Sequence, residues 1–272
     1  MKLTGGPDAQ RYIAVANGMK VPRPFNVRLL LPALCGTSAG RWWAVWAGSW
    51  PIAAAGFCGW RIASGDDWRL AVAAAVLLLA LPGVLGPSAV IPVGVDLPAT
   101  AVTLVACTVW ANGWHAAALL VLLLAAAIKE TSPVFAALWL WSPIPLIALI
   151  VPLVAHIVNR PGPDPLGPRF DEIAAHPFRT ACAAHRNRWR DGWLMVAPWG
   201  LGVACLYRPS WQLAVVLAVA YLQLLVATDT VRLLHHAAGP MVAVAAVRNL
   251  PVEWLPILLA AHVVWWRTPE RI

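Results

Sequence analysis

The residues best suited to chemistry begin with one carboxylate, Asp8, followed by two cations, Arg23 and Arg28. A carboxylate at a membrane surface can act as a general base, and arginines can clamp a phosphate. Simpler roles are also open at each position. Asp8 could cap a short helix over residues 8–17 that Gly18 closes, and the arginines could anchor to lipid headgroups.

A second polar group, Lys129 and Glu130, stands between two apolar runs. Lys129 could meet an anionic phosphate while Glu130 orients it or takes part in binding. The alternative is a plain helix boundary, in which Ser132 is the N-cap, Pro133 follows at the first helical position and Lys129 snorkels from the preceding helix.

A third polar group, Asp229, Arg232 and His236, shares one helix face because the spacing is i, i+3 and i+7. Thr228 could cap this helix, with Asp229 favoured by the helix dipole. Since the residues that follow are apolar enough to lie in a membrane, these ionisable groups are also candidates for a functional site.

The remaining polar loop, residues 159–192, carries the basic stretch that includes Arg186, Arg188 and Arg190. Residues 171–190 resemble amphipathic helices lying on a membrane face. The spacing of His176, Cys182 and His185 fits no zinc pattern, so we expect no metal there. A divalent cation as cofactor is otherwise left open.

The elements that position these groups follow from composition. Of the 272 residues, 60% are hydrophobic and only 12% are charged, which excludes disorder, collagen-like repeats and disulfide scaffolds. The apolar runs are solid rather than alternating, which favours helices over strands. They are Trp42–Trp60, Leu70–Leu85, Leu97–Ala111, His115–Ile128, Pro133–Val158, Trp193–Tyr207, Trp211–Ala227, Leu233–Val247 and Val252–Trp266.

These runs predict an all-α, polytopic transmembrane bundle of about nine spans, within a range of eight to ten, since a span needs roughly 20 apolar residues. The 24 prolines predict short, broken helices. Many of the 17 tryptophans stand at the ends of runs, as in an aromatic belt. The sequence thus predicts an integral protein of a bacterial plasma membrane.

The predicted organisation is one membrane domain in four parts. Residues 1–41 form an N-terminal interfacial segment, with Tyr12 on the apolar face of the first helix. Residues 42–158 form a first helix bundle, residues 159–192 the basic loop, and residues 193–272 a second bundle. The net charge of +8 favours membrane lipids as partners, rather than nucleic acid. The sequence does not predict an oligomeric state.

Three of these pieces together resemble a family. The pattern from Asp8 through Tyr12, Gly18, Pro24-Phe25 and Arg28 to Pro32 is similar to the first external loop of polytopic glycosyltransferases of the GT-C superfamily. Lys129-Glu130-Thr131 resembles their Lys/Arg-Glu-Thr segment, and Asp229-Thr230-Val231-Arg232 followed by Pro240 resembles their late polar helix start. These enzymes normally have a transmembrane helix before the acidic loop and a second acidic residue beside the first, and this sequence shows neither. The resemblance is therefore to a shortened or degenerate member.

The resemblance implies an enzyme that moves a sugar, with inversion, from a polyprenyl-phosphate donor to an acceptor on the extracytoplasmic side. Asp8 matches the position that deprotonates the acceptor hydroxyl. Arg23, Arg28, Lys129 or Arg232 would hold the lipid phosphate, because it leaves as an anion. On composition alone, the alternative is a non-enzymatic polytopic protein, such as a transporter or flippase of lipid-linked substrates or an envelope-complex subunit.

Overall fold

The chain forms two compact helical units in a computed structural model. The model describes residues 7–81, 93–166, 178–183, 197–225 and 230–250, with the single positions 84, 175, 176, 256 and 260. Every element within these residues is a helix. Unit 1 comprises Met1–Ala63 with Ser88–Pro177, and unit 2 comprises Ser64–Pro87 with Phe178–Ile272.

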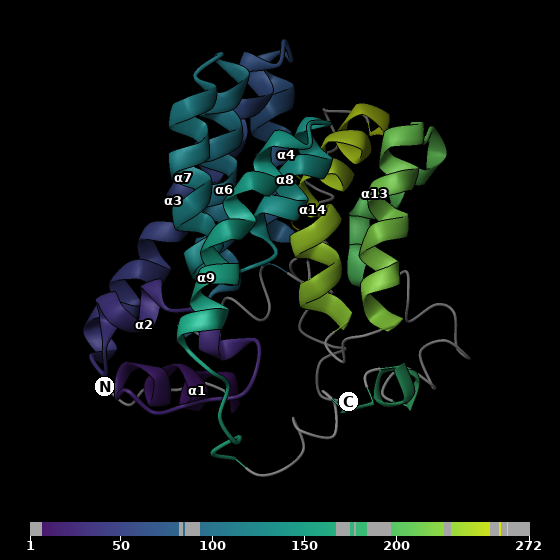
Figure 1. The fold of residues 1–272 in the computed structure, drawn as a ribbon. Helices are drawn as coiled ribbons and strands as arrows, with labels where there is room; N and C mark the ends of the chain where they lie inside the picture. The colour runs from purple at the N-terminus through teal and green to yellow at the C-terminus, as the bar shows by residue number, and fades with distance from the viewer. Residues whose placement is uncertain are drawn as a thin grey trace. The chain divides into compact units, whose positions relative to one another are not determined.

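Unit 1 is built around α6, which packs against α3 and α7 (Figure 1). Its described elements are α1 (Pro7–Ala16), η1 (Phe25–Val27), α2 (Leu30–Cys35), α3 (Ala39–Ala63), α6 (Asp96–Ala111), α7 (His115–Ile128), α8 (Ser132–Leu140), η2 (Ile144–Leu149) and α9 (Ile150–Val158). Small residues let α3 and α6 approach closely. Thr108 Oγ1 donates to the carbonyl of Gly56 at 2.6 Å, and a Cβ on Gly59 would lie 2.8 Å from Thr108 Cγ2.

The predicted N-terminal helix is confirmed to within one residue. It ends before Gly18, whose φ of +73° suits glycine. Its aromatic face is turned into the protein rather than toward a bilayer, because Tyr12 is only 2% exposed. The Tyr12 ring lies 5.2 Å from Phe25 and 6.2 Å from Trp42. The bilayer contact predicted for the Tyr12 face of this helix is therefore wrong.

Unit 2 is organised by α14, which packs against α4, α13 and η3. Its described elements are α4 (Trp68–Ala80), η3 (Ala197–Tyr207), α13 (Trp211–Leu222), η4 (Gln223–Leu225) and α14 (Thr230–Asn249). Glycines bring the helices together here as well. A Cβ on Gly202 would lie 2.7 Å from Val242 Cγ1, and one on Gly239 would lie 3.2 Å from Leu78 Cδ1.

None of the helices that the structure describes is both long enough and apolar enough to cross a membrane. The most apolar ones are short: α7 has 14 residues, about 21 Å at the rise of an α-helix, against a hydrocarbon core of roughly 30 Å. The longest, α3, has 25 residues but includes Arg41, Arg61 and four glycines. The prediction of about nine spans is wrong, and so is the integral membrane location that rested on it.

Two features explain why the apolar runs misled. The run Pro133–Val158 is divided into α8, η2 and α9, with a break at Trp141, whose φ is +50°. Several of the tryptophans assigned to a belt lie in the core instead, and Trp42 is fully buried while its indole N–H donates to the carbonyl of Gly36. Trp193, Trp254, Trp265 and Trp266 lie outside the described residues, as do most of the predicted amphipathic helices over residues 171–190.

Candidate functional site

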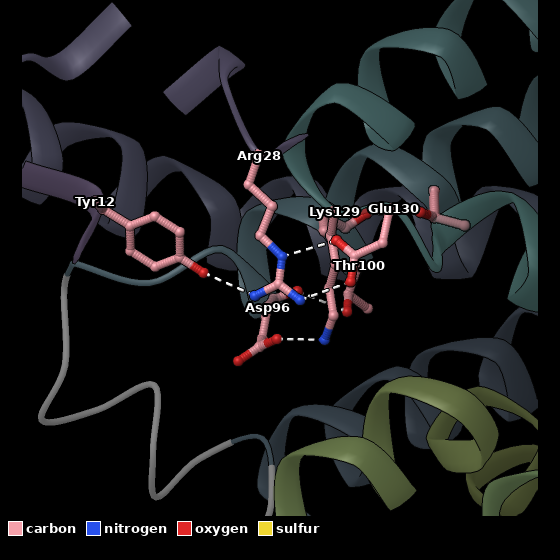
Figure 2. A network of polar contacts seen from close by, with 8 residues as sticks. Tyr12, Arg28, Asp96, Thr100, Lys129 and Glu130 are labelled. Carbon is pink, nitrogen blue, oxygen red and sulfur yellow. Dashed lines mark hydrogen bonds and ion pairs between the residues drawn. The ribbon is translucent and has the colours of Figure 1, made fainter. Parts of the chain in front are cut away.

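Arg28 lies at the centre of a charge network in unit 1, between η1 and α2. Its Nε and Nη2 each donate to a carboxylate oxygen of Glu130 at 2.7 Å, in the bidentate geometry that guanidinium and carboxylate prefer. Its Nη1 donates to Tyr12 Oη at 3.0 Å. Figure 2 shows the guanidinium held between the phenol on one side and Glu130 on the other.

The same network continues through Lys129, which follows the end of α7. Lys129 Nζ donates to Oδ1 of Asp96, the first residue of α6, at 2.5 Å (Figure 2). The lysine side chain is only 3% exposed, so it does not snorkel to a surface. Hereafter the charge network denotes Tyr12, Arg28, Asp96, Lys129 and Glu130, which come from four separate segments of the chain.

Burial and pairing set the protonation of the network. Burial alone would raise the pKa of Glu130, but the charge and hydrogen bonds of Arg28 together with the Lys129 charge outweigh it, and the pKa lies below its ordinary value of 4.5. Burial raises the pKa of the Tyr12 phenol well above its usual range. For Arg28, burial works against the charged form, yet the Glu130 charge and the interactions with Glu130 and Tyr12 together overcome it and raise the pKa. The network thus holds a neutral phenol between fixed charges.

Asp8 lies in the first turn of α1, where the helix dipole favours an acid, rather than at the N-cap. Its Oδ1 accepts from Arg11 Nη1 at 3.2 Å. Arg11 is in turn held by Asp164, which it meets through Nε at 3.0 Å and Nη2 at 2.6 Å. The hydrogen bond from Arg11 is the main cause that lowers the pKa of Asp164. Asp8 therefore shares an arginine that already has a buried counter-ion.

Asp8 also belongs electrostatically with the charge network. It precedes Tyr12 by one helical turn on the same face of α1. The charges of Asp96 and Asp8 both raise the pKa of the Tyr12 phenol, after the larger effect of burial. One face of α1 thus lies among the acids and cations of the site.

The acids of the site are more accessible than its cations. The side chains of Asp8, Asp96 and Glu130 are 26%, 23% and 23% exposed. Those of Arg28 and Lys129 are 12% and 3% exposed. An incoming ligand therefore meets hydrogen-bond acceptors first and reaches the cations by displacing a carboxylate.

Not all the residues predicted for the site join it. Arg23 is exposed, and its Nη2 donates to Nε2 of His156 in α9 at 2.7 Å. His236 lies in α14 of unit 2 and is 3% exposed. Asp229 and the side chain of Arg232 lie outside the described residues.

Sequence reasoning missed three charged residues of the region: Asp96, Arg11 and Asp164. Asp96 directly precedes an apolar run, and as one of only 12 acidic residues it could have been singled out. Arg11 stands three residues after Asp8, the spacing of a helical ion pair. Nothing in the local pattern around Asp164 predicted a contact with Arg11, 153 residues away.

The described residues contain no group of three or more His, Cys, Asp or Glu placed to hold a metal ion. Compared with protein-family models, curated proteins and solved structures, the chain matches no family model, no curated relative and no solved structure.

Proposed function

We propose that this chain is a glycosyltransferase that moves a sugar from a polyprenyl-phosphate donor to an acceptor hydroxyl. In this proposal Arg28 and Lys129 hold the donor phosphate, and Asp8 is the general base. The observation that carries it is that Arg28 joins Glu130 to Tyr12, on the helix that also presents Asp8. Lys129, next to Glu130 in the chain, is paired with Asp96 of the same network. The order of matching motifs along the chain also supports the proposal.

The arginine has the geometry that phosphate recognition requires. Glu130 presents two oxygens to Nε and Nη2 of Arg28, each at 2.7 Å. A phosphate can present two oxygens to the same edge of the guanidinium. Asp96 likewise occupies the Lys129 ammonium, through one carboxylate oxygen at 2.5 Å. Donor binding is therefore an exchange of partners, in which the partly exposed carboxylates give way to the phosphodiester anion of the donor.

Asp8 has the accessibility and orientation that a base requires. Its carboxylate is 26% exposed, and Arg11 fixes one of its oxygens. The acceptor hydroxyl oxygen attacks the anomeric carbon as the bond from that carbon to the phosphate oxygen breaks. The bonding electron pair leaves on the phosphate, next to Arg28 and Lys129, and the hydroxyl proton passes to Asp8. Attack opposite the leaving group inverts the anomeric centre.

The test is a transfer assay with a polyprenyl-phosphate sugar that is radiolabelled in the sugar. Asp8→Asn preserves shape but removes the base, and it should lower the rate by about 10²- to 10⁴-fold. Asp66→Asn is the matched control: Asp66 is also paired with an arginine, Arg248, but it lies in unit 2. An Asp8→Asn rate equal to that of wild type overturns the assignment of Asp8. Binding of the donor without transfer by wild type would favour a non-enzymatic carrier.

A further inference from the structure

The outward face of α9 carries an apolar stripe of the kind that normally faces a core. Its residues follow the spacing i, i+3, i+4, i+7 and i+8, which places them on one side of a helix. None of the residues of α9 is buried. The stripe consists of Ile150, Leu153, Val154, Ile157 and Val158, which are 50–71% exposed, and Ile147 of η2 extends it at 61%.

Cations surround the end of α9 that the stripe leads to. Lys20, Arg23 and Arg160 are all exposed. They are brought together because the chain after α9 is bound to the loop after α1: Asn26 Nδ2 donates to the carbonyl of Asn159 at 2.7 Å, and the Gly162 amide donates to the carbonyl of Val21 at 3.0 Å. The result is an apolar stripe with a basic end.

The opposite end of the stripe, at η2, is apolar rather than basic. Trp141, 40% exposed, stands at the left-handed break after α8. Beside it lies a shallow apolar depression of about 300 Å³, lined by residues of α8 and by Pro143 and Leu146. Tryptophan at a boundary between apolar and polar surroundings suits an aromatic ring whose N–H can stay hydrated.

We propose that this face, the stripe on η2 and α9 with its basic end, docks on the surface of an anionic lipid bilayer. The stripe would enter the acyl boundary, while Lys20, Arg23 and Arg160 meet the anionic headgroups. The charges favour lipid over a second copy of the chain. The acids in the described part of unit 1 are Asp8, Asp96, Glu130 and Asp164, and each is paired with a cation of its own unit. The described residues of another unit 1 thus offer the basic end no acid that is not already paired.

This proposal is independent of the transferase proposal, because its residues lie outside the charge network. It is tested by flotation of the purified chain with vesicles of phosphatidylcholine containing about a third phosphatidylglycerol, at about 0.15 M salt. Leu153→Glu/Ile157→Glu should lower the partition coefficient at least about tenfold. Both side chains are exposed, so the fold should tolerate the change. Ile52→Glu/Ile62→Glu on α3, at 47% and 48% exposure, is the matched control and should bind like wild type.

A second pair of variants separates charge from apolar contact. Lys20→Gln/Arg160→Gln should weaken binding to the anionic vesicles severalfold and leave the weaker binding to pure phosphatidylcholine unchanged. Two outcomes overturn the proposal: wild type that stays unbound to anionic vesicles, or a Leu153→Glu/Ile157→Glu variant that binds them as well as the α3 control does. Wild type that sediments as a dimer without binding vesicles, and becomes monomeric in the α9 variant, would assign the face to a second copy.

Discussion

Units 1 and 2 treat charge in opposite ways. In unit 1, the arginine of the Arg28–Glu130 pair is 12% exposed, and the lysine of the Lys129–Asp96 pair is 3% exposed. In the described part of unit 2, the pair between Arg248 and Asp66 leaves the arginine 52% exposed. Burying an ion pair is often no more stabilising than apolar packing of similar volume. Stability alone therefore does not require unit 1 to enclose the Arg28–Glu130 and Lys129–Asp96 pairs. This is the physical reason for placing the candidate functional site in unit 1.

The largest effect on stability is expected from breaking the Arg28–Glu130 pair of unit 1. Arg28→Met leaves the partly buried Glu130 without its counter-ion and should destabilise unit 1 by about 3 kcal/mol, the lower end of the range for a buried pair. Arg248→Ala in unit 2 should cost only about 1 kcal/mol, since the guanidinium is 52% exposed and solvent screens the pair, although Asp66 itself is 10% exposed. Amide hydrogen exchange followed peptide by peptide reports the two units separately. Equal losses from the two variants would remove the distinction.

Low pH should remove the stability that the Arg28–Glu130 pair contributes to unit 1. Glu130 has a lowered pKa in the folded chain, so its pairing contributes stability above pH 4.5, and this contribution is lost as the pH falls through the folded value. Glu130→Gln should therefore destabilise unit 1 by about 2 kcal/mol at neutral pH. The gap from wild type should narrow below pH 4.5, as measured by urea unfolding at several pH values. A gap that stays constant with pH would contradict the pairing.

Added volume should be costly at Gly202 of unit 2 but not at Gly48 of unit 1. Gly202→Ala places a Cβ 2.7 Å from Val242 Cγ1 and should cost about 1–2 kcal/mol, with partial recovery in Gly202→Ala/Val242→Ala. Gly48 lies inside α3 of unit 1 with no heavy atom within 4 Å of its added Cβ. Gly48→Ala should stabilise by about 0.5–1 kcal/mol, because alanine favours a helix. Thermal unfolding gives the sign of the stability change for each variant. The same sign for both variants would contradict the packing described at one of the two glycines.

The smallest effect on stability is expected at the N-terminus of α13, away from the ion pairs and from the glycine contacts. Ser210 caps α13, and its Oγ accepts from the Leu213 amide at 3.1 Å. Ser210→Ala should cost about 1 kcal/mol in unit 2, whereas Ser210→Asp should cost little because aspartate caps equally well. Exchange of the first amides of α13 measures the cap directly. A Ser210→Ala variant with unchanged exchange would exclude the cap.

Local features could be predicted from the sequence because they depend on neighbouring residues. The run His115–Ile128 is reproduced residue for residue as α7, and Gly18 ends the first helix as its conformational freedom suggests. Lys129 and Glu130 stood out because charges are rare among apolar runs. What failed was the inference from apolar content to a membrane. The same runs fill the cores of two units, where Trp42 of unit 1 and Val242 of unit 2 are fully buried.

Pairings between distant segments could not be predicted. Arg28 meets Glu130 across 102 residues, and Lys129 meets Asp96 rather than its neighbour Glu130. No helical period relates these positions, because turns and the packing of α6 against α7 bring them together. Residues such as Arg23 and Arg28 look alike in sequence, yet only Arg28 is buried among partners while Arg23 reaches His156.

Phosphate binding by Arg28 and Lys129 of unit 1 is the central claim of the proposed function. Titration calorimetry of a polyprenyl phosphate against the matching polyprenol, which lacks the phosphate, measures this directly in the wild-type chain. We expect the phosphate form to bind at least about tenfold more tightly, as charge-assisted hydrogen bonds imply. Glu130→Gln should increase that preference further, since it removes the carboxylate that competes for Arg28. Equal affinities for the two lipids, or a preference that Glu130→Gln leaves unchanged, would contradict the account.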